Sequence, residues 1–214
     1  MSRSMPPLAA QLTAELAVAG DIAAMATRLR ASAAIGAEVR KELTIHRTNL
    51  VYELAYLKVF NQWEVFLEEV FLRYLCGYRF HGSSETPLAA VCATIADARA
   101  RVYRTNQYLL WHSPAKVLAR ANAHFAEGNR VASVVGSALA DIERYGHIRH
   151  RVAHDQADAR QKFDTASMHL AARRFPGSRP GAFLRSMTLY NGMHSTWLER
   201  ISGELSTLAA QLAP

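Results

Sequence analysis

Residues 54–75, LAYLKVFNQWEVFLEEVFLRYL, are the stretch that decides the fold. Apolar side chains recur in it at the three- and four-residue spacing of an α-helix, and Trp63 lies near the middle of the stripe. Four further residues widen the apolar arc around this tryptophan: Tyr56, Val59, Phe66 and Phe71. A helix that is apolar over so wide an arc is surrounded by other elements, so we predict that this is the central, most buried helix.

Helical spacing extends over most of the remaining chain. The pattern continues upstream to Ile35, as one very long helix or as two in tandem with a break near 44–49. We predict helix starts at Pro87 and Pro114, where Thr or Ser precedes a proline, and another near Arg130. Further features are possible breaks at Gly20–Asp21 and Gly146, and a loop over 173–181.

The two ends of the chain carry helical stripes of their own. The first is made by Leu8, Leu12, Leu16, Ile22, Met25 and Leu29, and the last by Tyr190, Met193, Trp197, Ile201, Leu205, Leu208 and Leu212. No segment combines a clear apolar–polar alternation with a flanking turn, so no strand is predicted. We therefore expect an all-α, antiparallel helical bundle over 35–214, preceded by an N-terminal helical extension over 1–34.

Composition limits the class of protein. The 214 residues are half hydrophobic, which excludes a disordered chain, and 25 Lys and Arg against 18 Asp and Glu give a net charge of +7. This excess favours an anionic partner such as nucleic acid. Cys76 and Cys92 form no CxxC pair and indicate small core residues in a reducing compartment. Glu15 and Asp21 interrupt the apolar N-terminus, so we expect no signal peptide, no membrane span and a soluble, cytoplasmic protein.

Residues 144–155, RYGHIRHRVAHD, concentrate the ionisable side chains of the chain. One interpretation is a solvated helix face whose buried side is Ile148 and Val152. A second is a metal site formed by His147, His150 and His154, which lie within about 60° of one another on a helix. The first and last of these imidazoles are roughly 10 Å apart along the axis, so a single ion would need ligands from another helix.

A third interpretation is phosphate chemistry by Arg149 and His154. The imidazole can exchange a proton with a ribose hydroxyl near neutral pH, and the guanidinium can stabilise charge on a phosphoryl group. Five positions on an ideal helix place the two side chains about 140° apart. They converge on one phosphate only if the helix is irregular or if a second copy of the motif takes part.

The segment RHRVAH, 149–154, resembles the signature of the HEPN superfamily, in which Arg is followed after four to six residues by His. That signature often carries Asn, Asp or His directly after the arginine, the position of His150. The WExFLE core at 63–68 is similar to the aromatic-acidic helix of the RiboL-PSP-HEPN-like branch. The similarity covers about residues 35–212, and the first helix is an addition to it.

The resemblance implies a helical bundle that dimerises and brings two Arg-His motifs together in a composite cleft. It implies a metal-independent endoribonuclease without cofactors that leaves 2′,3′-cyclic phosphate ends, in a toxin or phage-defence role with RNA as substrate. An antitoxin or another defence-system protein is then a further partner. The alternative within the same superfamily is a non-catalytic module that binds RNA, a nucleotide or a protein.

Carried over to this chain, the resemblance implies His154 as the general acid-base and Arg149 as the group that stabilises the phosphate. His150 would orient a catalytic group or bind substrate, Asp155 would tune His154 or cap the local backbone, and Glu64 would face the cleft from the central helix. Each of these three is also explained as a polar side chain on the surface of a helix, without a function. Arginines around the 173–181 loop are candidates for backbone-phosphate contacts.

Overall fold

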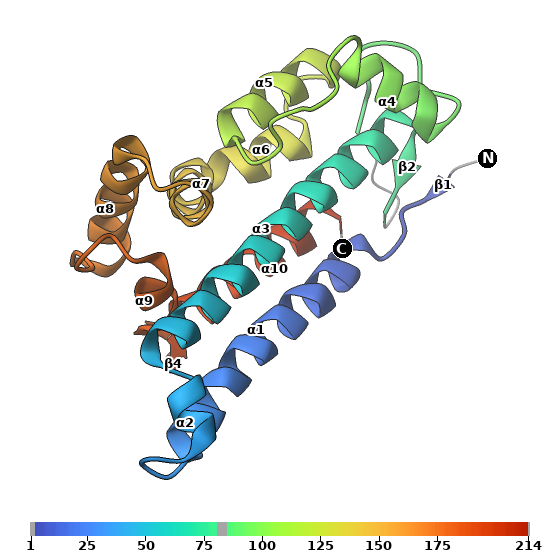
Figure 1. The fold of residues 1–214 in the computed structure, drawn as a ribbon. Coiled ribbons are helices and arrows are strands. Elements are labelled where there is room, and N and C mark those ends of the chain that lie inside the picture. The colour runs from blue at the N-terminus through green and yellow to red at the C-terminus, as the bar shows by residue number, and fades with distance from the viewer. Residues whose placement is uncertain (1–2, 81–84, 214) are drawn as a thin grey trace. The chain divides into compact units, whose positions relative to one another are not determined.

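The computed structural model describes residues 3–80 and 85–213, and the all-α prediction is confirmed (Figure 1). Two short pairs of strands accompany the helices: β1 (Arg3–Ser4) with β2 (Tyr78–Arg79), and β3 (Met187–Tyr190) with β4 (Met193–Thr196). The helices in these ranges are α1 (Leu8–Ser32), α2 (Glu38–Glu42), α3 (Ile45–Leu75), α4 (Ile95–Tyr103), α5 (Pro114–His124), α6 (Arg130–Ser137), α7 (Leu139–Ala153), α8 (Ala157–Ala171), α9 (Pro180–Arg185) and α10 (Trp197–Leu212).

The described residues form two compact units, each assembled from segments that are distant in sequence. The first unit takes its residues from 1–12, 62–143 and 205–214, and the second from 13–61 and 144–204. The histidine-rich stretch lies in the second unit. The expected division into 1–34 and 35–214 follows the order of the sequence and stays a prediction.

α3 is the buried central helix that its sequence predicts. It continues over 31 residues without glycine or proline, and Trp63 is fully buried. In the first unit, Phe71 packs edge-on against Trp111 and Phe125, with ring centroids 5.4 and 4.9 Å apart. The predicted break near 44–49 lies slightly earlier, at 43–44, and separates α2 from α3.

An aromatic cluster forms the core of the second unit. Phe183 of α9 contacts Phe163 of α8, Phe175 of the preceding loop and Trp197 of α10, at centroid distances between 5.0 and 6.1 Å. The hydroxyl of Tyr56 donates to the Tyr145 carbonyl at 2.8 Å. These contacts hold α7, α8 and α9 around the first half of α3.

α1 runs alongside α3 (Figure 1). Its buried positions in the second unit are Leu16, Ala19, Ala23 and Ala26, whereas the predicted stripe residues Ile22, Met25 and Leu29 are exposed. The helix continues through Gly20–Asp21, so the predicted break is absent. Among the described residues, α1 is the one helix long and apolar enough to cross a bilayer, and an alanine-rich face of it is buried inside the protein.

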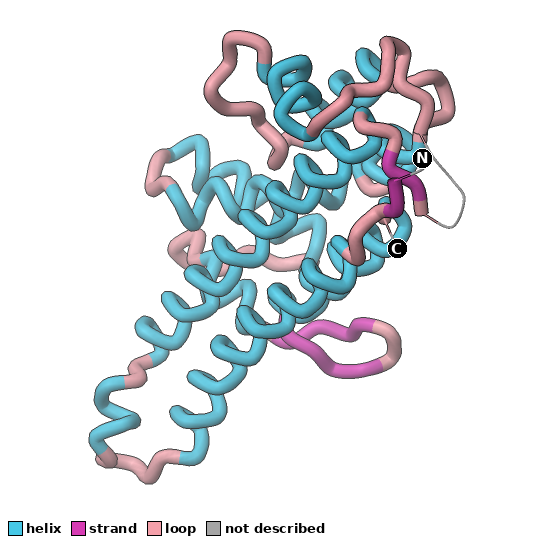
Figure 2. The backbone as a smooth tube through the Cα atoms, turned by 90° about the vertical axis from the view of Figure 1, so that its right-hand side faces the viewer, coloured by secondary structure: helices cyan, strands magenta, loops and turns pink. Residues whose placement is uncertain are grey.

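The prediction that the last helix includes Tyr190 and Met193 is wrong. Residues 187–196 form an antiparallel hairpin, visible as paired strands in Figure 2, and α10 begins at Trp197. Asn191 and Gly192 both have positive φ, 50° and 78°, which is the geometry of a tight hairpin turn. This Asn-Gly pair between alternating apolar residues is a strand signal, and it overrides the helical spacing of 190, 193 and 197.

Two of the three predicted helix starts are confirmed. α5 begins at Pro114, and α6 begins at Arg130 after Asn129, whose side chain accepts from the Ala132 amide at 2.8 Å. The start at Pro87 is wrong, because Pro87 forms a β-bridge with Phe125. α4 instead begins eight residues later, after Thr94, which forms a capping box with Asp97.

Two expectations on breaks and loops also need correction. α7 continues through Gly146 without interruption, so this glycine does not make the helix irregular before the histidines. The predicted loop over 173–181 ends earlier, since Pro180 is the first residue of α9.

Candidate functional site

The histidine-rich stretch forms the last turns of α7 and the link to α8. α7 ends at Ala153, and the His154 amide still donates to the His150 carbonyl at 2.9 Å, which extends the last turn by one residue. His154 and Asp155 are both exposed. The general acid-base candidate is therefore accessible to a large substrate.

His150 and His154 are brought together by this last turn. Their ring centroids lie 4.9 Å apart, at an interplanar angle of 52°. On the other side of His150, its Nε2 lies 3.8 Å from Oδ2 of Asp158, which is itself paired with Lys162. The structure thus places two imidazoles side by side, next to a carboxylate and an ammonium group.

The pKa of His150 is lowered from its ordinary value of 6.5. Partial burial is the largest cause, followed by the neighbouring charges of His154 and Lys162, and the Asp158 carboxylate opposes the shift. Near neutral pH this imidazole is therefore unprotonated and can accept a proton.

Arg149 lies within α7, five positions before His154, which corresponds to about 140° around an ideal helix. Its side chain is half-buried, and its Nε is buried without a hydrogen-bond partner among the residues that the structure describes. Convergence of Arg149 and His154 on one phosphate stays a prediction that requires a second copy of the chain.

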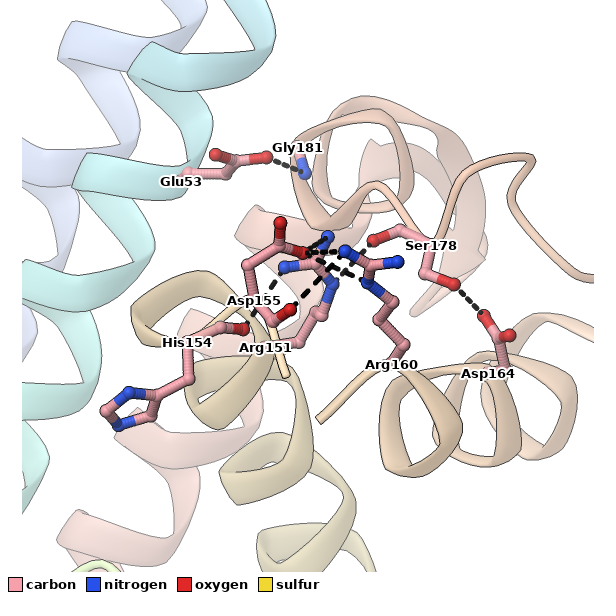
Figure 3. A network of polar contacts seen from close by, with 8 residues as sticks. All are labelled: Glu53, Arg151, His154, Asp155, Arg160, Asp164, Ser178 and Gly181. Carbon is pink, nitrogen blue, oxygen red and sulfur yellow. Dashed lines mark hydrogen bonds and ion pairs between the residues drawn. The ribbon is translucent and has the colours of Figure 1, made fainter. Parts of the chain in front are cut away.

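Arg151, a residue that the sequence reading did not single out, organises the link after α7 (Figure 3). Its guanidinium donates to the Ser178 carbonyl at 3.0 Å and to the His154 carbonyl at 3.1 Å, and it lies 3.0 Å from Asp155 Oδ1. The sequence signal was the four-residue spacing of an arginine and an aspartate. These bonds hold the backbone of His154 in place.

Asp155 belongs to this arginine network. Its Oδ1 accepts from Nε and Nη2 of Arg160 at 3.0 and 2.8 Å, and these bonds are the main cause of its lowered pKa. Figure 3 shows the His154 ring directed away from the Asp155 carboxylate. In this arrangement Asp155 holds the α7–α8 link, and it acts on His154 through Arg151.

A cavity of about 320 Å³ lies beside the arginine network within the second unit. Glu53 in its wall accepts from the Gly181 amide at 2.8 Å, and Asn49 accepts from Arg185 at 2.9 Å. Arg151 and Arg179 bring positive charge to the lining, and Glu53 and Asp155 bring negative charge. The groups that carry this polarity are His46, Asn49, Glu53, Arg151, Asp155 and Arg179. Sequence spacing did not indicate His46 or Glu53, because α3 and the 179–180 segment meet only in the fold.

Glu64 lies in the first unit, whereas the histidine-rich stretch belongs to the second. It is buried, and its Oε2 accepts from the Tyr108 hydroxyl at 3.0 Å and lies 3.3 Å from Nδ1 of His112. Its other oxygen is buried without a partner among the described residues. The supporting role that the resemblance implies for Glu64 stays a prediction.

The metal-site interpretation of the stretch finds no set of ligands in the described part of the chain. No three His, Cys, Asp or Glu side chains there gather closely enough to hold an ion.

Loop arginines around 173–185 have different surroundings. Arg173 lies over the Phe175 ring and Arg185 donates to Asn49, whereas Arg174 and Arg179 are exposed. The latter two are the better placed for contacts with a polyanion.

Comparison with protein-family models, with curated proteins and with solved structures finds no match to this chain.

Proposed function

We propose that this chain is a metal-independent endoribonuclease of the HEPN type. The observation that carries the proposal is the exposed His154 beside His150, an imidazole whose lowered pKa keeps it unprotonated near neutral pH. Two neighbouring imidazoles can take one proton and supply another in the same reaction. The net charge of +7 supports RNA as the substrate.

The proposed reaction is an internal transfer at phosphorus. His154 removes the proton of the ribose 2′-hydroxyl, and the 2′-oxygen bonds to the adjacent phosphorus as the bond to the 5′-oxygen breaks. The His154 imidazole of the second subunit, in its protonated form, donates to the leaving 5′-oxygen, so the products are a 2′,3′-cyclic phosphate and a 5′-hydroxyl. Arg149, contributed by the second subunit of a homodimer, stabilises charge on the phosphoryl oxygens.

The biological setting belongs to the same proposal. A cytoplasmic nuclease of this kind acts as a toxin or in phage defence, and an antitoxin or another defence protein restrains it. The arginine network that fixes the His154 backbone supports a precise position for this residue.

Cleavage of a labelled single-stranded RNA in the presence of EDTA tests the activity. We expect products with cyclic phosphate and 5′-hydroxyl ends, and a loss of about 100-fold or more in rate for His154→Ala and for Arg149→Ala. His169→Ala, at an exposed histidine of α8, and Arg104→Ala, at an exposed arginine, are the matched controls and keep full activity. Absence of cleavage by the folded wild-type protein, or activity that survives both site substitutions, contradicts the proposal.

A non-catalytic module that binds RNA is the second candidate function. The half-buried position of Arg149, about 140° around an ideal helix from His154 in the same chain, favours it. Salt-sensitive binding of RNA by wild-type protein that leaves the RNA intact would decide for this candidate.

A further inference from the structure

α1 carries a row of large apolar side chains that the fold leaves uncovered. Val18, Ile22, Met25 and Leu29 recur at intervals of four, three and four residues, and each is 47–58% exposed. This spacing places them on one narrow stripe, which we call the α1 stripe. A stripe of this spacing is the seam by which one helix packs against another.

The α1 stripe is separate from the face that packs on α3. The buried face uses Leu16, Ala19, Ala23 and Ala26, about 100° around the helix from the stripe. On the α3 side of the stripe, Glu15 forms an ion pair with Lys58 at 2.9 Å. Leu54, one turn before Lys58, is also exposed and extends the apolar surface toward α3. The fold thus covers one face of α1 and leaves a second apolar face in water.

Two opposite charges flank the α1 stripe on the side away from α3. Asp21 and Arg28 are exposed, are seven residues apart and so occupy the same side of the helix. Neither forms an ion pair within the part of the chain that the structure describes. Their midpoint lies within one residue of the middle of the stripe, so the surface is complementary to itself under a two-fold rotation.

We infer that the α1 stripe packs antiparallel against the α1 stripe of a second copy of this chain. The two-fold axis passes near residues 24 and 25, and Asp21 of each copy lies opposite Arg28 of the other. In an antiparallel pair, the flank with Asp21 and Arg28 lies next to the same flank of the partner helix. In a parallel pair, this flank would lie next to the opposite flank of the partner, so only the antiparallel arrangement forms these ion pairs.

This contact is independent of the proposed nuclease chemistry. In Figure 1, α3 lies between α1 and α7 of the second unit, so the α1 contact leaves the histidine-rich stretch open. Pairing through α1 therefore does not compete with a contact at that stretch.

Sedimentation of the full chain over a range of micromolar concentrations tests the inference. We expect Ile22→Asp to halve the mass of the wild-type assembly, whereas Val65→Asp, at an exposed apolar residue of α3, leaves it unchanged. Circular dichroism verifies that both variants keep their helices. An unchanged mass for Ile22→Asp overturns the inference, and so does a monomeric wild-type protein that binds phosphatidylglycerol vesicles.

Charge reversal tests the partner and the direction. Asp21→Arg places an arginine opposite Arg28 of the partner's helix at each of the two symmetric contacts, so it raises the dissociation constant at least about tenfold, and Arg28→Asp does the same by pairing two aspartates. The double variant Asp21→Arg, Arg28→Asp restores both ion pairs and wild-type affinity. A double variant as weak as the single ones overturns the antiparallel self-contact.

Discussion

His150 shows how one side chain links stability to pH at the candidate site. Burial and the charges of His154, Lys162 and Arg149 lower its pKa, and Asp158 only partly compensates. A group with a lowered pKa binds fewer protons in the folded state than in the unfolded state, so its protonation favours unfolding. This loss in the free energy of unfolding is absent above the ordinary histidine pKa of 6.5. It grows as the pH falls toward the lowered pKa that His150 has in the folded state.

We therefore predict that His150→Gln flattens the pH dependence of stability. The wild-type free energy of unfolding falls between about pH 7 and pH 5, and the variant loses less over the same interval because it has no proton to bind there. Urea denaturation at a series of pH values measures this. The matched control is His169→Gln, an exposed histidine for which a slope like that of the wild type is expected. A steeper slope in His150→Gln would contradict the direction of the pKa shift.

At the scale of elements, one glycine sets the distance between α9 and α3. A Cβ on Gly181 would overlap the Asn49 carbonyl and come within 2.7 Å of its carbon, and the Gly181 amide donates to Glu53. The close approach closes one wall of the cavity beside the arginine network. Backbone atoms cannot withdraw from a clash as the end of a side chain can.

Gly181→Ala is predicted to lower the free energy of unfolding by about 1–3 kcal/mol, the usual cost of overpacking. Gly136→Ala is its control, because the added Cβ would lie an ordinary 3.7 Å from Leu118 in the helical α6. The control should gain about 0.5–1 kcal/mol from helix propensity. Thermal or chemical denaturation of the two variants gives the comparison, and equal effects would refute this account of α9.

For the whole molecule, the net charge of +7 favours a polyanion, so the proposed binding of RNA is expected to weaken with salt. We predict that the affinity of the His154→Ala variant for single-stranded RNA falls linearly on a log–log plot against salt concentration. With about four phosphate contacts the slope is about −2.8, so a threefold rise in salt weakens binding about twentyfold. Fluorescence anisotropy with a labelled RNA measures the slope. An affinity that does not change with salt would exclude a phosphate-binding surface.

Much of the helical architecture could be predicted because its signals are local. The stripe of 54–75 encodes a buried helix by itself, and Pro114 and Asn129 mark helix starts within a few residues. The same local reasoning failed at Pro87 and at 187–196, where a bridge to Phe125 and a tight Asn191–Gly192 turn decide the conformation. Where a segment fits both a helical and a strand pattern, the contacts that form in the folded protein decide its secondary structure.

Only part of the candidate site could be predicted from spacing along the helix. A single turn of helix suffices to pair His150 with His154, so the sequence by itself determined that these imidazoles are neighbours. Only the tertiary structure decided that Asp155 binds Arg151 and Arg160, and that Glu53 meets Gly181 across 128 residues. It also decided that α1 buries its alanines and exposes its larger side chains. Spacing along a helix reports which side chains share a face, whereas the choice of the face that is buried depends on the partner helix and on how closely the two backbones can pack.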